Sequence, residues 1–272
     1  LERFLEDVQA AEPDAPAPAG RHGGYLTLVR ALGARTAELH AALSRAEGDA
    51  AFEPVRIDAT DISAWARRAH GEAVAVLDRL ERNHAAWPMP TRAEAAQVVG
   101  ARAVILARID ARADTGDAGH RIRIHGDYHL GQVLVVQNDF VIADFEGEPA
   151  RTLAERREKQ SPMKDVAGML RSFDYALHAA LRRLEGDGSE LRATRIQRGV
   201  EWLAATQAAF IDSYDRAAAA AGLPGAQAQR NGLLDLFLFE KVMYELKYEM
   251  ENRPDWVGIP LRGLIDLLHA QA

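Results

Sequence analysis

Apolar side chains recur at intervals of three and four residues over most of the chain, the spacing that gathers them on one face of an α-helix. This pattern predicts helices over residues 1–8, 25–45, 61–84, 91–113, 161–177, 189–221, 229–251 and 259–269. Residues 10–24, rich in Ala, Pro and Gly, predict a mobile loop or linker, residues 48–59 an irregular segment and residues 114–119 a turn. Two helix starts carry local signals: Ser161 with Pro162 suits a first turn, and Thr91 with Glu94 predicts a capping box.

The pattern changes to that of β-structure between residues 121 and 143. Residues 121–124 alternate polar and apolar side chains, while residues 133–136 and 140–143 are apolar, mainly β-branched and aromatic runs on either side of Asn138-Asp139. Such runs around an Asn-Asp turn are typical of a β-hairpin. The predicted order is strand, tight loop, strand, turn, strand, within a chain that is otherwise mostly α.

The ends of these predicted strands hold residues that suit metal and proton chemistry. His125-Gly126-Asp127 follows the first strand, Gln132 lies five residues after Asp127, and Asp144 follows the hairpin. We expect the two carboxylates to lie close together because their strands pair. In phosphotransferases a loop Asp accepts the proton of the substrate hydroxyl, while an amide and a second Asp hold Mg²⁺ against the phosphates. The tripeptide alone is more often an ordinary β-turn, but an amide and a second carboxylate in register with it favour a phosphotransferase site.

Composition narrows the function further. The chain has 272 residues, a formal net charge of −7 and no cysteine. The absence of cysteine excludes a disulfide framework and cysteine catalysis and fits a reducing compartment, so we expect a cytoplasmic protein. No apolar run approaches the roughly 20 residues that span a bilayer, and the acidic balance argues against nucleic acid as a main partner.

The arrangement resembles the catalytic half of protein-kinase-like enzymes. His125-Gly126-Asp127 stands where protein kinases have His-Arg-Asp, and the His-Gly-Asp form is usual in small-molecule kinases of the aminoglycoside-phosphotransferase type. Asp144-Phe145-Glu146 stands where protein kinases have Asp-Phe-Gly, and Gln132 replaces the usual Asn. Gln carries the same carbonyl one methylene further out, so it can still ligate a hard cation. The resemblance implies ATP and Mg²⁺ as cofactors, with Asp127 as catalytic residue and Gln132 and Asp144 as metal ligands.

The same resemblance gives supporting roles around the loop to His125, Glu146 and Asp165. Asp165 lies in the first turn of the helix predicted from residue 161, where the helix dipole favours an anion. In kinase-like folds an Asp near the start of this helix braces the backbone of the catalytic loop. Simple complementation of the dipole remains the alternative reading of Asp165.

Longer stretches resemble the maltokinase family, namely residues 125–132, 144–151, 153–157, 161–175, 241–249, 252–256 and 259–261. The resemblance implies transfer of the γ-phosphate of ATP to the anomeric hydroxyl of maltose, giving maltose 1-phosphate, with the sugar bound by Asp127, Lys241, Tyr244 and Tyr248. Aromatic rings offer flat contact to the C–H faces of a sugar and Lys offers donors, although the two Tyr residues also suit ordinary boundary positions. In that family the domain also occurs fused behind trehalose synthase, which is therefore a candidate fused or associated partner.

One departure concerns the nucleotide. Kinase-like enzymes carry a β-rich N-terminal lobe with a Lys for the phosphates, and the residues before Asp127 show no such pattern. We therefore expect residues 1–24 to be an interlobe remnant and linker, and residues 25–272 to be a C-terminal kinase-like lobe that is inactive without an N-terminal lobe in the same polypeptide. Within this lobe we expect a helical part (25–119), a catalytic loop with its metal hairpin (120–160) and a helical sugar-binding part (161–272). Another sugar or aminoglycoside kinase, or a non-catalytic sugar-binding or docking module, remain alternatives.

Overall fold

A computed structural model describes residues 23–45, 47–111, 118–183, 189–223 and 226–269. The helix predicted at residues 1–8, the predicted linker up to residue 22 and most of the turn at 114–119 lie outside these ranges. Residues 23 and 24, which we expected in the linker, belong to a helix. No helix in the described ranges is long and apolar enough to cross a bilayer.

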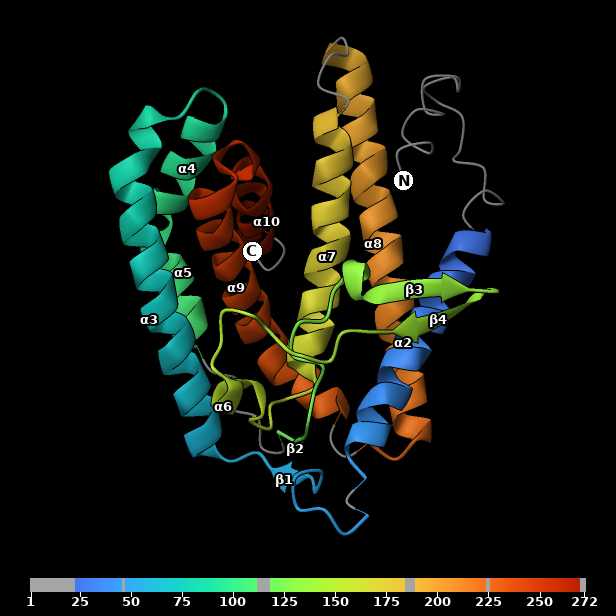
Figure 1. The fold of residues 1–272 in the computed structure, drawn as a ribbon. Helices are drawn as coiled ribbons and strands as arrows, with labels where there is room; N and C mark the ends of the chain where they lie inside the picture. Colours follow the sequence, from blue (N-terminus) through green and yellow to red (C-terminus); the bar gives the residue numbers. More distant parts are fainter. Residues whose placement is uncertain (1–22, 46, 112–117, 184–188, 224–225, 270–272) are drawn as a thin grey trace.

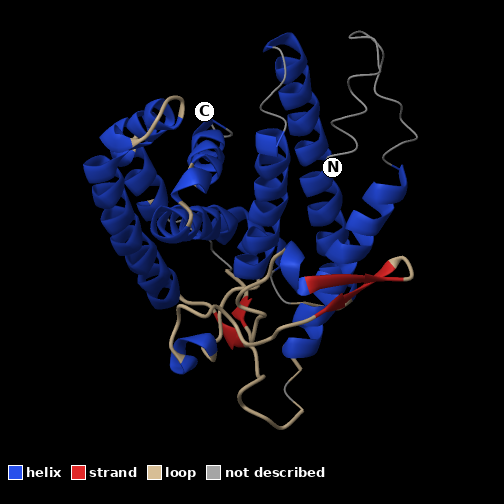
Figure 2. Ribbon diagram, turned by 45° about the horizontal axis from the view of Figure 1, so that its top comes forward, coloured by secondary structure: helices blue, strands red, loops and turns tan. Residues whose placement is uncertain are grey.

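The described chain is mostly helical, as predicted (Figure 1). The helices are α2 (Gly23–Leu43), α3 (Ala59–Asn83), α4 (Thr91–Gly100), α5 (Arg102–Asp110), α6 (Leu153–Arg156), α7 (Met163–Arg183), α8 (Ser189–Ala220), α9 (Ala226–Asn252) and α10 (Gly258–His269), with 3₁₀ turns η2 (His84–Ala86), η3 (Leu130–Gln132) and η4 (Pro254–Trp256). Helix α7 packs against α8 and α9, α2 lies along α8, α3 and α5 contact α9, and α10 contacts both α7 and α9. The segments between β2 and α7 gather at one end of these helices (Figures 1 and 2).

Two small antiparallel sheets interrupt the helices. β1 (Val55–Arg56), in the segment predicted to be irregular, pairs with β2 (His120–Arg121), which is shorter than the predicted strand at 121–124. β3 (Val133–Val136) and β4 (Asp139–Ile142) form the predicted hairpin. Its turn is Gln137-Asn138, one residue earlier than predicted, and both residues have positive φ, at 54° and 76°. Asn tolerates this left-handed region better than most residues, which favours it at the second turn position.

Two helix predictions were wrong in their details. The helix predicted over 91–113 is broken at Ala101 into α4 and α5. The capping box predicted at its start is absent: α4 has no side-chain cap, and the Glu94 carboxylate instead accepts a hydrogen bond from Arg262 of α10 at 2.8 Å. Arg262 of another helix therefore binds the Glu94 side chain, which the local sequence pattern had assigned to the helix cap. A capping box does occur at α3, where Asp58 and Asp61 close the first turn.

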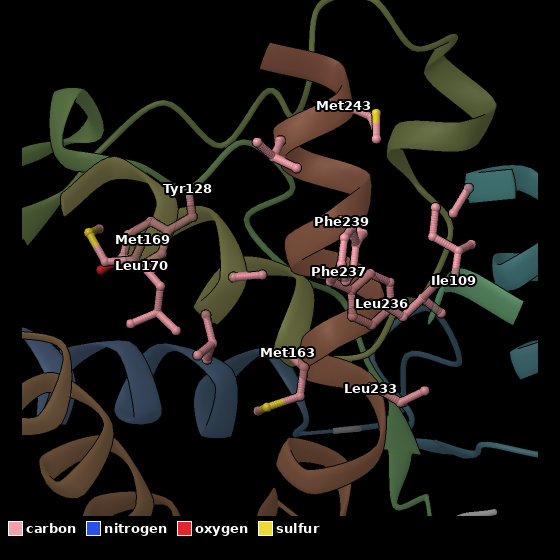
Figure 3. Packing of buried hydrophobic residues seen from close by; sticks show 14 of the residues in the cluster. Ile109, Tyr128, Met163, Met169, Leu170, Leu233, Leu236, Phe237, Phe239 and Met243 are labelled. Carbon is pink, nitrogen blue, oxygen red and sulfur yellow. The ribbon is translucent and has the colours of Figure 1, made fainter. Parts of the chain in front are cut away.

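The apolar stripes predicted from periodicity lie inside the protein, as at Trp65, Ala69, Val76 and Leu80 of α3. Figure 3 shows the central part of the core, where side chains of α7 and α9 pack together. Tyr128, which directly follows Asp127, is 2% exposed and lies near Met169 and Leu170 in this core. Its hydroxyl is 2.8 Å from Thr36 Oγ1 of α2. The loop after β2 is thus anchored in the core through an aromatic side chain.

Candidate functional site

The loop at residues 125–127 is held by a buried carboxylate. One oxygen of Asp165 accepts a hydrogen bond from the His125 amide at 2.8 Å, and the other accepts from the Gly126 amide at 2.9 Å. Gly126 has a φ of +86°, a left-handed conformation that glycine adopts without strain. Asp165 therefore makes the backbone contacts expected of a brace, in addition to lying in the first turn of α7.

His40 and Tyr214 extend the hydrogen-bond network of Asp165 into the core. His40 Nε2 lies 3.1 Å from Asp165 Oδ2, and His40 Nδ1 lies 2.9 Å from the Tyr214 hydroxyl. His40 is fully buried, so it is a core histidine with two partners. Burial alone would raise the pKa of Asp165, but the hydrogen bond from His40 and the loop amides outweigh it and lower that pKa. Asp165 is therefore an ionised acceptor at neutral pH.

The hairpin brings the two predicted metal ligands together. The Ala143 amide donates to the Gln132 carbonyl at 2.9 Å, which extends the β3–β4 ladder to its open end. Asp144 follows with a φ of +65°, and its Oδ2 accepts a hydrogen bond from Gln132 Nε2 at 2.8 Å. Asp144 is exposed and Gln132 is half-buried, and a carboxylate beside an amide is a donor set that suits Mg²⁺ once the amide presents its oxygen.

Asp127 and Asp144 are connected, but not by the strand pairing that we expected. β2 pairs with β1, whereas β4 pairs with β3. The link is His125, whose Nε2 donates to the Ala143 carbonyl at 2.8 Å and whose ring lies 5.0 Å from that of Phe145. The predicted pairing of their strands is therefore wrong, and the His125 side chain connects the two segments instead.

Electrostatics give a second sign that the two carboxylates share a region. His129 is half-buried, and burial lowers its pKa, while Asp127 and Asp144 both oppose that shift. His129 Nε2 also lies 3.8 Å from Asp127 Oδ2. The His129 imidazole thus interacts electrostatically with both carboxylates.

Three of the predicted sugar-binding residues, Lys241, Tyr244 and Tyr248, form a row on α9, and Lys241 contacts the fourth, Asp127. Lys241 Nζ lies 3.3 Å from Asp127 Oδ1 and 4.9 Å from the centre of the Tyr244 ring. The Tyr244 and Tyr248 rings stack with 6.4 Å between their centres, one helical turn apart. Burial, with Glu148 and Asp127 nearby, raises the pKa of Tyr244 to about 12, so its hydroxyl stays protonated. Asp127, Lys241 and Tyr244 all line one pocket, while Tyr248 is largely exposed beyond it.

The same pocket contains a charge network that the sequence interpretation missed. Arg151 Nε lies 3.4 Å from Glu148 Oε2, and its Nη2 lies 3.4 Å from Glu240 Oε1. Lys164 Nζ binds the same Glu240 oxygen at 2.8 Å. Burial would raise the pKa of Glu240, but the two cations outweigh it and lower that pKa. Glu240 directly precedes Lys241 on α9, and its partners come from two other segments, the loop before α6 and the first turn of α7.

Glu146, expected to support the catalytic loop, has no visible role there. It is exposed, and among the described residues no hydrogen bond or ion pair reaches its side chain. The neighbouring Gly147 is buried, and a Cβ placed on Gly126 would meet its Cα at 3.4 Å. The segment after Asp144 therefore contacts the catalytic loop through its backbone.

Comparison with known proteins finds that this chain is similar to sugar kinases. No protein-family model matches the chain. The chain is 30% identical to the glucosamine kinase of Streptacidiphilus jiangxiensis over 255 residues, which cover 90% of this chain and 51% of that protein. It is 29% identical to the glucosamine kinase of Mycolicibacterium smegmatis over 263 residues, which cover 96% of this chain and 57% of that protein.

Solved structures of glucosamine kinases are similar to this chain in fold. A glucosamine kinase in complex with glucosamine, ADP and inorganic phosphate superposes with a TM-score of 0.75 at 25% identity, over 97% of this chain and 56% of that chain. Crystal form B of a glucosamine kinase gives a TM-score of 0.75 at 24% identity, over 98% of this chain and 58% of that chain. The chain spans about half the length of the curated relatives it matches. It is therefore similar to glucosamine kinases in sequence and fold, which supports a relationship with sugar kinases without naming its own sugar.

Proposed function

We propose that this chain is the part of an ATP-dependent sugar kinase that binds the sugar and positions its hydroxyl to accept the phosphate. The observation that carries the proposal is the position of Asp127. It lies on a loop braced by Asp165, lines the pocket beside Lys241, and is linked through His125 to the segment that carries Asp144. A hydroxyl in that pocket would meet a proton acceptor on the side from which a nucleotide phosphate would approach. The loop and the hairpin thus carry a proton acceptor and two candidate metal ligands, groups that phosphoryl transfer requires.

Each residue has a chemical role in this proposal. Asp127 accepts a hydrogen bond from the attacking sugar hydroxyl, orients it and takes its proton. Lys241 fixes the Asp127 carboxylate and can donate to a neighbouring sugar oxygen. Gln132 and Asp144 would hold Mg²⁺, which supplies neutralisation of phosphate charge when bound. Positioning of the reacting groups supplies most of the remaining acceleration.

For the sugar, we propose a neutral disaccharide such as maltose, with maltose 1-phosphate as product. Glu148 and Glu240 of the pocket are paired with Arg151 or Lys164, and Asp127 is paired with Lys241. An amino sugar brings an ammonium group that would need one of these carboxylates, whereas a neutral sugar needs only hydroxyl partners. The stacked rings of Tyr244 and Tyr248 extend the site along α9, which suits a second sugar ring.

Glucosamine is the second candidate acceptor, because the curated relatives are named glucosamine kinases. An aminoglycoside is less suited, because a polycation would face Arg151, Lys164 and Lys241 in the pocket. A non-catalytic docking module, with or without trehalose synthase as partner, would not need Asp127, Gln132 and Asp144 gathered on one loop system.

The test uses the natural full-length polypeptide with ATP and a panel of maltose, glucose, glucosamine and an aminoglycoside, with ADP release as the readout. We expect phosphorylation of maltose, and we expect Asp127→Asn to lower kcat by about 100-fold or more while maltose binding changes little. Asp78→Asn, at an exposed ion pair with Arg102 on the far helices, is the matched control and should retain activity. Activity of Asp127→Asn above about a tenth of the parent would count against the proposed base. Turnover of glucosamine alone would replace maltose by glucosamine.

A further inference from the structure

We propose that Asp174, His178 and Asp266 form a binding site for a divalent transition-metal ion, with Zn²⁺ as the preferred ion. Asp174 and His178 lie four residues apart on one face of α7, and Asp266 lies on α10. His178 Nε2 is 3.5 Å from Asp174 Oδ1 and 3.5 Å from Asp266 Oδ2. One donor atom from each of the three side chains lies within 4.8 Å of the others.

These distances match the edges of a metal polyhedron. Ligand atoms about 2.1 Å from a tetrahedral ion lie roughly 3.4 Å from each other. The two distances of 3.5 Å are therefore close to the spacing needed around a shared ion, and they are long for direct hydrogen bonds. A small rotation of Asp266, which is largely exposed on α10, can adjust the third edge.

The histidine is the second observation, independent of the acidic cluster. His178 is only 8% exposed, and neither ring nitrogen makes a hydrogen bond in the structure. A proton on Nε2 can pair with both carboxylates, which outweigh burial and raise the pKa of His178 to about 9, so a metal ion that binds here would displace that proton. A cation at the centre of the three groups satisfies Nε2 and both acids together.

Asp174 is prepared as a ligand by its other oxygen. Arg171 Nη1 donates to Asp174 Oδ2 at 2.6 Å, which leaves Oδ1 directed at His178. Arg171 also donates to Glu245 at 2.7 Å, so its charge is shared and does not cancel that of Asp174 alone. Gly263, one turn before Asp266, makes room for this arrangement, because a Cβ there would lie 2.3 Å from Arg171 Nη1. Such outer contacts orient the ligands of protein metal sites.

The donor set favours zinc over magnesium. One imidazole nitrogen and two carboxylate oxygens are common zinc ligands, whereas Mg²⁺ prefers oxygen donors in octahedral geometry. The site is also separate from the Gln132–Asp144 pair. His178 lies thirteen residues beyond Asp165 on α7, about 20 Å along a helix at 1.5 Å per residue. Because its ligands come from α7 and α10, a bound ion would clamp these two helices together.

The proposal is tested on the natural full-length polypeptide, freed of metal by a chelator. Calorimetric titration with zinc chloride and the absorption spectrum of a Co²⁺-substituted sample report binding, and thermal unfolding reports the clamp. We expect one zinc equivalent at this site, a tetrahedral Co²⁺ spectrum and a higher Tm with Zn²⁺. His178→Gln and Asp266→Asn should each weaken this binding by about tenfold or more and remove the Tm gain.

Three controls keep the outcome decisive. His70→Gln changes an exposed His–Asp pair on other helices and should bind zinc like the parent. Asp144→Asn changes the proposed magnesium site and not this one, so this variant should also bind zinc like the parent in the calorimetric titration. Asp266→Asn changes an exposed side chain, so it remains informative if His178→Gln fails to fold. The proposal is overturned if the parent binds no zinc, or if zinc binding survives both ligand substitutions.

Discussion

Gly168 of α7 offers the sharpest test of how the catalytic loop is positioned. A Cβ added at residue 168 would lie 2.5 Å from the carbonyl oxygen of Tyr128, against an ordinary contact of at least 3.4 Å. Gly168→Ala therefore requires the loop and the helix to separate by about 0.9 Å, the difference between these distances. Asp127 directly precedes Tyr128, so this displacement reaches the proposed catalytic carboxylate.

The loop has little freedom to absorb that displacement. The Tyr128 side chain is buried in the core and its hydroxyl is bound to Thr36, while the Leu130 amide donates to Ser172 Oγ at 3.0 Å. Overpacking of this kind costs about 1–3 kcal/mol, partly offset by about 0.5–1 kcal/mol from replacing a helical glycine by alanine. We expect a net loss of about 1–2 kcal/mol in unfolding free energy. A displacement near 1 Å should lower kcat by about 100-fold.

Gly71→Ala is the matched control. Gly71 is exposed in the middle of α3, and nothing lies within 4 Å of a Cβ built there. This substitution should stabilise the protein by about 0.5–1 kcal/mol and leave kcat unchanged. Urea denaturation gives the two stabilities, and steady-state kinetics of the full-length polypeptide gives kcat. If Gly168→Ala were as stable and as active as Gly71→Ala, the close approach of α7 would not position the loop.

Two further predictions concern buried charges. The pKa of Asp165 is lowered on folding, so its contribution to stability is complete above the unfolded value of about 3.9 and is lost as the pH falls through the lower folded value. The unfolding free energy of the parent, measured in urea between pH 3 and pH 6, should therefore fall more steeply at the acidic end than that of Asp165→Asn; parallel curves would contradict this. Arg171→Met leaves Asp174 and Glu245 buried without their cation and should cost about 3–5 kcal/mol in the same assay at pH 7. Arg79→Met, at an exposed ion pair between α3 and α9, should cost less than about 1 kcal/mol, and equal losses for the two variants would refute the argument.

The helices could be predicted from sequence because their apolar stripes are long and regular. The stripe of α3 identified buried residues correctly at Trp65 and Leu80. Features set by distant partners could not be predicted in this way. β1 has only two residues and exists because His120-Arg121 pairs with it, and Glu94 turns away from its own helix end because Arg262 binds it. In both cases a tertiary contact decides a structure that local pattern leaves open.

In the candidate site, too, residues close in sequence could be predicted and contacts between distant segments could not. Asp127, Gln132 and Asp144 could be proposed from their spacing because a short hairpin and one loop position all three. The network of Arg151 with Glu240 could not, because their side chains meet across 89 residues of sequence. The same holds for Asp174 and Asp266, which come from two helices and carry no recognisable spacing.

The charge network also gives a physical basis for choosing between a neutral sugar and an amino sugar. An ammonium group that binds Glu240 would displace Lys164, which would then lie in the pocket without its partner, whereas Arg151 would keep Glu72 and Glu148. Leaving a buried charge unpaired costs about 3–5 kcal/mol, which corresponds to a factor of about 10² to 10³ in binding. A hydroxyl group causes no such exchange, because it can donate to a carboxylate that remains bound to its cation. This pairing is the physical basis on which we propose a neutral acceptor, and the acceptor panel with ATP tests it against glucosamine, the sugar for which the relatives are named.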